Sequence, residues 1–388
     1  MNIGGYFDYN ATTPLSSSVK AAMVSALEQF ENPSAIYASP EGAKRILDDA
    51  RANVAALIGA TPEQIIFTSG ATESNNWVIR ACLEEVSQAG AFVTSAIEHD
   101  ATLASGKMIC ARTQREMRVV APDATGIVQA QALGQACSGA VALVSVMLAN
   151  NETGAVQPIA EIAKIAAQKD AFFHVDAVQA AGKMPIDVKA LGCDSLSLSA
   201  HKFHGPKGVG VMYLKDPSRL SPMVVGGGQE RGQRAGTENI VGIAGMGAAC
   251  AEAHRDLSQR QDHVAHLRGA LIEALQARHV HFVINGPVQR GDTIESTLNL
   301  SFPGIRAEAL VMRLGLVHKI ALSMGSACST NKDRRHSHVL QAMDLDEQRL
   351  VSAIRISFGK YTTLEDIVTL ADSLADALHM IKSIAAAE

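Results

Sequence analysis

The sequence predicts an α/β protein built on a mixed, mainly parallel seven-stranded sheet, with a second, smaller α/β domain. Between about residues 50 and 215, short apolar runs alternate with amphipathic stretches, which is the pattern of strands and helices in such a sheet. The chain has 388 residues, of which 47% are apolar and 19% charged, so it can bury a large core. At about 150 residues per domain, this length predicts two domains.

Seven apolar runs are the predicted strands of the main sheet. They lie at residues 64–69, 91–97, 117–122, 140–148, 171–175, 195–200 and 208–214. Only the segment HKFHGPKG joins the last two runs, and a parallel pair needs a crossover of about a dozen residues or more. We therefore expect residues 208–214 to run antiparallel to residues 195–200, which makes the sheet mixed.

The C-terminal part of the chain is predicted to form the smaller domain. Its elements are a glycine-rich stretch (224–239), a long polar helix (about 250–279), two strands (near 296–302 and 354–359) and a closing helix (about 364–384). The closing helix has apolar residues at helical spacing and contains neither glycine nor proline. We expect a large domain at residues 14–258 and a small domain formed by residues 1–13 and 259–388.

Charge and cysteine content exclude several classes of protein. The formal net charge is −5 and is spread along the chain, which argues against a general nucleic-acid binder. The longest apolar run is shorter than the roughly 18 residues that a membrane span needs. The first residues lack the basic and apolar regions of a secretory signal, so we expect a cytoplasmic protein. Six scattered cysteines without a CxxC pair predict neither a disulfide framework nor a metal site.

Polar residues follow the ends of five predicted strands. They are Gly70-Ala71-Thr72, Glu98-His99, Asn150-Asn151, Asp176 with Gln179, and His201-Lys202. Ligands of open α/β sheets bind at the carboxyl ends of parallel strands. We therefore expect these side chains to meet in one crevice.

The chemistry that these residues jointly suit is that of pyridoxal phosphate. A helix that begins near Thr72 offers N–H groups to a phosphate. Asp176 is suited to hold the pyridine nitrogen protonated, Lys202 to form the Schiff base, and His99 to stack on the ring. Taken alone, each residue has a simpler role: Asp176 as a helix cap, His99 as a structural histidine, and Lys202, like nearby Lys207, as a solvated lysine. All of these simpler roles would have to hold at once, which favours the cofactor site.

Ordered motifs along nearly the whole chain carry a family resemblance. They are YFDYNATTP, FTSGATES, EH, VMLANNETG, HVDAVQAAGKMPID, the HK of SAHKFHGPKGVG, GGGQERGQRAGTEN, MGSACST, and IRISFG with YTT after it. With these motifs the chain resembles the cysteine desulfurases of aminotransferase class V, and within them the NifS/IscS-like group. The resemblance implies the fold type I of pyridoxal phosphate enzymes and a homodimer.

The resemblance also implies roles for single residues. Lys202 would form the Schiff base with the cofactor, Asp176 would bind its pyridine nitrogen, and His99 would stack on the ring and move protons. Asn151 and Gln179 would contact ring substituents, with Gln179 near the phenolic oxygen. The implied phosphate ligands are Thr72, Ser199, His201 and, from the partner subunit, Thr237. Arg355 would clamp the substrate carboxylate, helped by Asn32 and Asn151.

Cys328 is the residue on which the implied reaction depends. It lies among small residues, and Lys332, Arg334, Arg335, His336 and His338 follow it. Nearby cations lower the pKa of a thiol and favour the nucleophilic thiolate. The resemblance implies that Cys328 takes the sulfur of L-cysteine as a persulfide and that L-alanine is released. The basic cluster is either a solvated loop or a docking site for an acidic sulfur acceptor.

The acceptor and the substrate leave alternatives open. Iron–sulfur cluster assembly, transfer-RNA thiolation and DNA phosphorothioation all draw on enzymes of this kind. Selenocysteine lyase or another class V activity is the alternative enzyme, and a catalytically silent binding subunit is a third hypothesis. The sequence departs from the usual family pattern at residues 31–42, at Ala200 and at Met324. The first of these departures lies at the predicted substrate pocket.

Overall fold

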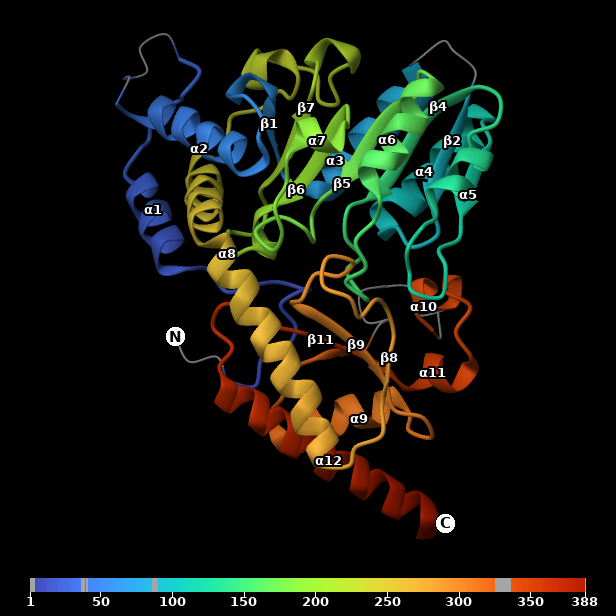
Figure 1. Cartoon of the computed structure of the whole chain (residues 1–388). Coiled ribbons are helices and arrows are strands. Elements are labelled where there is room, and N and C mark those ends of the chain that lie inside the picture. The colour runs from blue at the N-terminus through green and yellow to red at the C-terminus, as the bar shows by residue number, and fades with distance from the viewer. Residues whose placement is uncertain (1–3, 36–38, 40, 86–89, 325–335, 388) are drawn as a thin grey trace.

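The fold places seven strands in one sheet and four in another (Figure 1). The structure is a computed structural model that describes residues 4–35, 39, 41–85, 90–324 and 336–387. The main sheet consists of β1 (Ile65–Thr68), β2 (Ala91–Ser95), β3 (Met117–Val120), β4 (Val141–Met147), β5 (Phe172–Asp176), β6 (Ser195–Ser199) and β7 (Gly210–Leu214). Each strand begins and ends within two residues of its predicted range.

Strand order explains why ligands can collect at one edge of the main sheet. The order is β1-β7-β6-β5-β4-β2-β3. Strand β7 is antiparallel to both of its neighbours, and all other pairs are parallel. The mixed, mainly parallel sheet is therefore confirmed. The carboxyl ends of β2, β4, β5 and β6 lie at the same edge, as parallel pairing requires.

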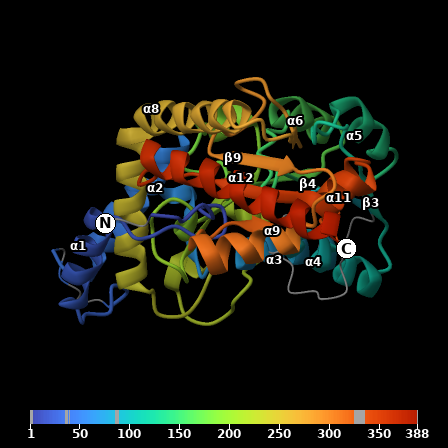
Figure 2. The same cartoon turned by 90° about the horizontal axis from the view of Figure 1, so that it is seen from below.

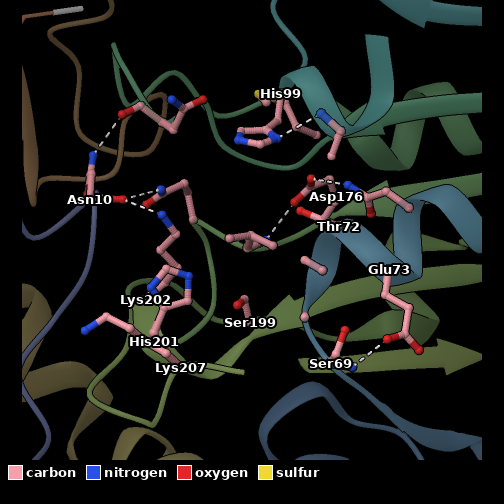
Figure 3. Close-up of a pocket in the computed structure, with 18 of the residues that line it drawn as sticks. Asn10, Ser69, Thr72, Glu73, His99, Asp176, Ser199, His201, Lys202 and Lys207 are labelled. Carbon is pink, nitrogen blue, oxygen red and sulfur yellow. Dashed lines mark hydrogen bonds between the residues drawn. The ribbon is translucent and has the colours of Figure 1, made fainter. Parts of the chain in front are cut away.

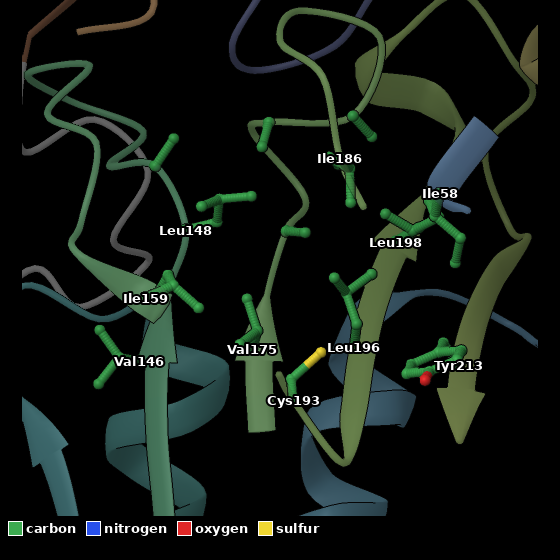
Figure 4. Packing of buried hydrophobic residues seen from close by; sticks show 14 of the residues in the cluster. Ile58, Val146, Leu148, Ile159, Val175, Ile186, Cys193, Leu196, Leu198 and Tyr213 are labelled. Carbon is green, nitrogen blue, oxygen red and sulfur yellow. The ribbon is translucent and has the colours of Figure 1, made fainter. Parts of the chain in front are cut away.

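Alternate residues of the strands enter two different hydrophobic clusters. Ile65 and Phe67 of β1 belong to one cluster, whereas Ile66 between them belongs to the other. The first face is covered by α2 (Ala43–Ile58), α6 (Ile159–Gln168) and part of α8 (Ile240–Ala277), as Figure 4 shows in part. The second face is covered by α3 (Ala71–Arg80) and α4 (Asp100–Thr113). Strands buried on both faces account for the nearly continuous apolar runs of the sequence.

The second sheet is antiparallel and much smaller. Its order is β10-β11-β9-β8, with β8 (Val283–Ile284), β9 (Thr297–Ser301), β10 (Ser323–Met324) and β11 (Ala353–Ser357). Both predicted strands are present as β9 and β11. Two strands were missed, because β8 and β10 have only two residues each and leave no alternating pattern. Residues of α9 (Ala307–Arg313) and α12 (Leu364–Ala387) pack on this sheet (Figure 2).

Helix α8 runs from the first sheet to the second. Ala253 packs in the first cluster and Val264 in the hydrophobic cluster of the second sheet. The prediction that this helix begins near residue 250 was wrong, because it begins at Ile240, where the Asn239 side chain accepts the Gly242 N–H at 3.0 Å. Its first turns are rich in glycine. A Cβ on Gly247 would lie 2.6 Å from Ala50 Cα, so this glycine allows α2 and α8 to pack closely.

The remaining elements are short helices and a connection from the N-terminus. Helix α1 (Ser17–Leu27) follows a segment that pairs with the second sheet at Tyr6 and Asp8. The other helical elements are η1 (Pro62–Gln64), η2 (Ala81–Glu85), α5 (Ala130–Ala136), α7 (Val188–Leu191), η3 (Ala200–Lys202), η4 (Pro217–Arg219), η5 (Gln229–Gly232), η6 (Leu314–His318), α10 (His338–Ala342) and α11 (Glu347–Ser352). In the described part of the chain, every helix is too short or too polar to cross a membrane.

A buried ion pair ties the glycine-rich segment to the main sheet. Arg51 on α2 donates to Glu230 through Nη1 at 2.9 Å and Nη2 at 2.8 Å. The Phe67 N–H of β1 also donates to this carboxylate, at 2.9 Å. Both charged side chains are buried, with exposed fractions of 8% and 3%. Removing one partner would leave the other charge uncompensated in the interior.

We expect Glu230→Ala to lower the free energy of unfolding by about 3 to 5 kcal/mol, because Arg51 would stay buried without its partner. Urea denaturation followed by circular dichroism measures this loss. Asp48→Ala is the matched control, since it breaks the exposed Lys44–Asp48 pair and should cost less than about 1 kcal/mol. Equal losses in the two variants would show that the buried pair is not a structural anchor.

Candidate active site

A pocket of about 470 Å³ lies at the carboxyl ends of the parallel strands (Figure 3). It has the size of a small-molecule site. Eight residues predicted from the sequence line it: Thr72, His99, Asn151, Asp176, Gln179, Ser199, His201 and Lys202. They come from the ends of β2, β4, β5 and β6 and from the start of α3. The expectation that these strand ends share one crevice is therefore confirmed, although Glu98 and Asn150 are buried and do not line it.

Asp176 ends β5 with both carboxylate oxygens hydrogen-bonded. Oδ1 accepts from the Val178 N–H at 3.0 Å, and Oδ2 accepts from Asn75 Nδ2 on α3 at 2.7 Å. The first bond caps the turn after β5, so Asp176 does serve as a cap. It also lines the pocket. An aspartate fixed in this way can offer its remaining lone pairs to a protonated ring nitrogen.

A second pair of bonds fixes Asn75. Its Oδ1 lies 3.0 Å from His174 Nε2, and His174 Nδ1 lies 2.8 Å from Ser195 Oγ. Since Asn75 Oδ1 only accepts, His174 donates through Nε2 and accepts the Ser195 hydroxyl proton at Nδ1. Burial lowers the pKa of His174 to about 3, so the ring is neutral. The order Ser195, His174, Asn75, Asp176 forms a buried chain of hydrogen bonds that orients the carboxylate.

Lys202 points its amine at the N-terminal segment. Its Nζ donates to Asn10 O at 2.8 Å and to Ala11 O at 2.9 Å. Lys207 lines the same pocket but is exposed, whereas Lys202 is partly buried. Of the two lysines, Lys202 is therefore the one held inside the pocket.

The start of α3 has the features of an anion site. Its N-cap is Gly70, and within the described residues this position has no side-chain hydrogen bond to the N–H groups of the first turn. Thr72 lies in that turn. A Cβ on Gly210 of β7 would lie 2.6 Å from Gly70 Cα, so only glycine lets the two backbones approach. Ser199 and His201 line the pocket from β6 and η3. Burial, together with Lys202 and Lys207, lowers the pKa of His201 to about 4, which keeps it neutral.

His99 caps α4 and faces the pocket at the same time. Its Nδ1 accepts the Ala101 N–H at 3.0 Å, so the neutral ring carries its proton on Nε2. His99 is exposed in the single chain, and Figure 3 shows it at the same pocket as Asp176 and Lys202. The bond to Ala101 fixes the tautomer, and a ring held this way can stack on a planar ligand.

Four predicted residues lie elsewhere. Arg355 on β11 is fully buried, where Nη2 donates to Asp8 Oδ1 at 2.7 Å and Nη1 to Asn151 O at 3.2 Å. It is therefore next to a pocket residue without lining the pocket. Asn32 and Thr237 are exposed and do not line the pocket of this chain. Cys328, with the basic residues up to 335, lies outside the described residues.

The sequence analysis missed three functional candidates. Asn10 and Asn75 line the pocket, and Lys183 donates to Gln179 Oε1 at 2.6 Å. Asn10 and Lys183 lie inside motifs that carry the family resemblance, and Asn75 directly follows one of them, which was the available signal. None of them follows a strand directly, so the strand-end argument passed over them. Within the residues that the structure describes, no group of three or more His, Cys, Asp or Glu side chains could hold a metal ion.

The fold and the pocket define a pyridoxal phosphate enzyme of fold type I, and comparison with known proteins gives the family. The chain matches the model of the aminotransferase class-V family over residues 5–370 and belongs to that family. It is similar to the cysteine desulfurase IscS of Dictyoglomus turgidum, with 38% identity over 98% of this chain and 95% of that protein.

Solved structures agree with this assignment. A NifS-like protein superposes with a TM-score of 0.89 and 35% identity, over 97% of this chain and all of that one. The protein SspA, solved in complex with cysteine, superposes with a TM-score of 0.80 and 33% identity, over 92% of this chain and 100% of that one. The predicted fold type, family and cofactor are therefore confirmed.

The residues present fit pyridoxal 5′-phosphate, the cofactor of this family. The pocket combines an uncapped helix start at Gly70, an oriented carboxylate at Asp176 and a lysine amine at Lys202. These are the groups that a phosphate, a pyridinium nitrogen and an aldehyde require.

Glu98 is a buried acid beside this site. Its Oε1 accepts from Ser95 Oγ at 2.5 Å and from the Met147 N–H at 2.9 Å, and its backbone oxygen accepts from His338 Nε2 at 2.9 Å. Burial, with a smaller contribution from Asp176, raises the pKa of Glu98 to about 8. The folded protein therefore holds Glu98 protonated at neutral pH, whereas the unfolded chain does not.

We expect Glu98→Gln to become more stable relative to the native protein as pH rises from 4.5 to 8. In this range folding takes up a proton at Glu98, so the native free energy of unfolding falls by up to about 1.4 kcal/mol per pH unit. Glutamine resembles the protonated acid and does not titrate, so the stability of the variant lacks this dependence on pH. Urea denaturation of both proteins at several pH values measures the difference, and a constant difference across the range would contradict a protonated Glu98.

Proposed function

We propose that the protein is a pyridoxal phosphate-dependent cysteine desulfurase that converts L-cysteine to L-alanine and transfers the sulfur to Cys328 as a persulfide. The observation that carries the proposal is the convergence of Lys202, Asp176 and His99 from three strand ends on one pocket. Similarity to proteins named cysteine desulfurase supports the choice of substrate. In the part of the chain that the structure describes, no observation favours selenocysteine lyase or another class V activity.

In this proposal each pocket residue binds a different part of the cofactor. Lys202 would bond covalently to it, Asp176 would hold the pyridine nitrogen, and His99 would stack on the ring. Asn151 and Gln179 contact ring substituents, with Gln179 at the phenolic oxygen. Thr72, Ser199 and His201 bind the phosphate, together with Thr237 of a second copy of the chain. When bound, the cofactor withdraws electrons from the substrate Cα and so acidifies its proton.

Lys202 is the base in this scheme. Its Nζ would take the α-proton of the substrate, and the Asn10 and Ala11 carbonyl oxygens hold the amine in place. His99 moves a proton at Nε2, since Nδ1 is occupied by Ala101. The buried chain of hydrogen bonds behind Asp176 keeps its carboxylate oriented, so that it would hold the ring nitrogen of the cofactor.

Substrate recognition centres on Arg355. Its guanidinium matches a carboxylate bidentately, and Asp8 holds it 2.7 Å away in the described structure. Asp8 thus keeps the buried arginine neutralised until a substrate carboxylate competes for it. Asn32 and Asn151 assist in binding the substrate.

Sulfur transfer is balanced in atoms and electrons. The Cys328 thiolate attacks the substrate sulfur, the Cβ–S bond breaks, and a proton returns to the alanine carbon. L-cysteine and a thiol become L-alanine and a persulfide. An acidic acceptor protein, such as an iron–sulfur scaffold, then collects the sulfur; supply for transfer-RNA thiolation or DNA phosphorothioation uses the same first step. The basic residues after Cys328 support this partner by charge.

Assembly and location are also part of the proposal. We expect a cytoplasmic homodimer. We further propose residues 14–258 as the large domain and residues 1–13 with 259–388 as the small one. The change of cluster along α8 between Ala253 and Val264 supports this boundary.

The first test is the intact mass of the holoenzyme after brief exposure to L-cysteine without reductant, beside an alanine assay. We expect the native protein to gain the mass of sulfur and release alanine, and Cys328→Ala to do neither. Cys110→Ala is the matched control, because this thiol is buried with a raised pKa and should be inert. Sulfur gained equally by Cys328→Ala would refute the role of Cys328.

Arg355→Lys tests substrate binding. It keeps the charge but loses the bidentate geometry, so we expect KM for L-cysteine to rise about 10- to 100-fold, with a smaller change in kcat. Steady-state alanine release measures both constants. Arg313→Lys, at the end of α9 and paired with Asp376, is the control and should leave KM unchanged. A fall in kcat at constant KM would assign Arg355 a different role.

A further inference from the structure

A second lysine lies beside the reactive one without lining the main pocket. Lys183 is partly buried in the turn that follows β5. Its Nζ donates to Gln179 Oε1 at 2.6 Å and to Asn10 Oδ1 at 2.8 Å. Lys202 donates to the backbone oxygen of the same Asn10. Lys183 and Lys202 also both line a second cavity, of about 40 Å³.

The hydrogen-bond partners of Gln179 determine the orientation of its side-chain amide. A lysine amine donates and offers no acceptor when charged, so Gln179 must turn Oε1 toward Lys183. The other end agrees, because Gln179 Nε2 donates to Asn10 O at 3.0 Å, and a carbonyl oxygen only accepts. Since Oε1 is taken by Lys183, the group that Gln179 can offer to the main pocket is its second N–H.

We propose that Lys183 is a positioning residue that locks the Gln179 amide so that it presents an N–H donor to the bound cofactor. This inference rests on the proposed function, in which Gln179 contacts the phenolic oxygen. A donor there stabilises negative charge on that oxygen and so favours the form of the bound chromophore that has lost its proton. Lys183 thereby lowers the pH at which the chromophore titrates.

The charge state of Lys183 does not decide this role. Burial, then the positive charges of Lys202 and Arg355, lowers the pKa of Lys183 well below its ordinary value. A neutral amine still has two N–H groups, and two acceptors are within reach, at Gln179 and Asn10. The lock therefore operates with or without a proton on Lys183.

Asn10 supports the lock from the other side. Its Oδ1 accepts from Lys183, while its Nδ2 donates to Thr297 Oγ1 at 2.8 Å and to Asn151 O at 3.1 Å. The amide of Asn10 is thus fixed by an acceptor-only carbonyl at one end and the lysine at the other. Lys183 holds two side-chain amides in a single orientation each.

The test is a pH titration of the visible absorbance of the substrate-free holoenzyme. We expect Lys183→Met to raise the midpoint by about one pH unit, the effect of one hydrogen bond to a charged oxygen. Gln179→Leu should raise it to a similar extent. Lys183→Arg keeps a donor-only head group and should restore most of the native value. Lys189→Met, on the exposed surface of α7, is the control and should leave the midpoint unchanged.

The double variant separates positioning from a plain charge effect. If Lys183 acts through Gln179, Lys183→Met with Gln179→Leu should titrate like Gln179→Leu alone. Additive shifts, or an unchanged midpoint in Lys183→Met, would overturn the proposal. If Lys183→Met fails to fold or to hold cofactor, Gln179→Glu decides, since it keeps the Lys183 contact but replaces the donor by an acceptor. A native midpoint in that variant would also overturn it.

The titration contains no cysteine, so its outcome is independent of sulfur transfer. An enzyme that shows the expected midpoints but gains no sulfur on Cys328 would contradict the desulfurase proposal and support the role of Lys183. An enzyme that gains sulfur on Cys328 but shows unchanged midpoints would contradict the role of Lys183 alone.

Discussion

The hydrogen bonds of Asn10 join the two sheets and the pocket at a single residue. Its backbone N–H donates to Ser357 Oγ on β11, and its side chain donates to Thr297 on β9. Its backbone oxygen accepts from both Lys202 and Gln179, which come from the main sheet. The position of the reactive lysine is therefore tied to the second sheet, although that lysine belongs to the first. A loss of register between the two sheets would misplace the amine.

Hydrogen bonds between buried polar side chains determine the geometry of the site as much as the residues that line the pocket do. Asn75 and His174 carry no charge, yet their hydrogen bonds decide how the Asp176 carboxylate is presented. Lys183 acts in the same way on Gln179. In both cases an acceptor-only oxygen, Asp176 Oδ2 for Asn75 and Asn10 O for Gln179, removes the freedom of the amide to flip. Such a site is organised before its cofactor arrives.

The sequence predicted the strands and the pocket well, and the contacts behind the pocket poorly. Most of the seven strands were found because strands buried on both faces are nearly continuous apolar runs, as in β4. The strand-end rule located Asp176, His99 and Lys202, because parallel strands bring their ends together. It could not find Asn75 or Lys183, whose partners are fixed by tertiary packing: Asn75 and Asp176 are far apart in the chain. The two-residue strands β8 and β10 and the glycine-rich start of α8 likewise carry no periodic signal.

The packing of α10 has a consequence for dissecting the molecule. Val339, Leu340 and Met343 follow the second sheet's β10 in the chain but belong to the hydrophobic cluster of the first sheet. A fragment ending in the middle of α8 would lack these side chains and would bare the apolar surface that they cover. The main sheet is thus not an autonomous folding unit, and the C-terminal third of the chain completes the core that the first two thirds begin.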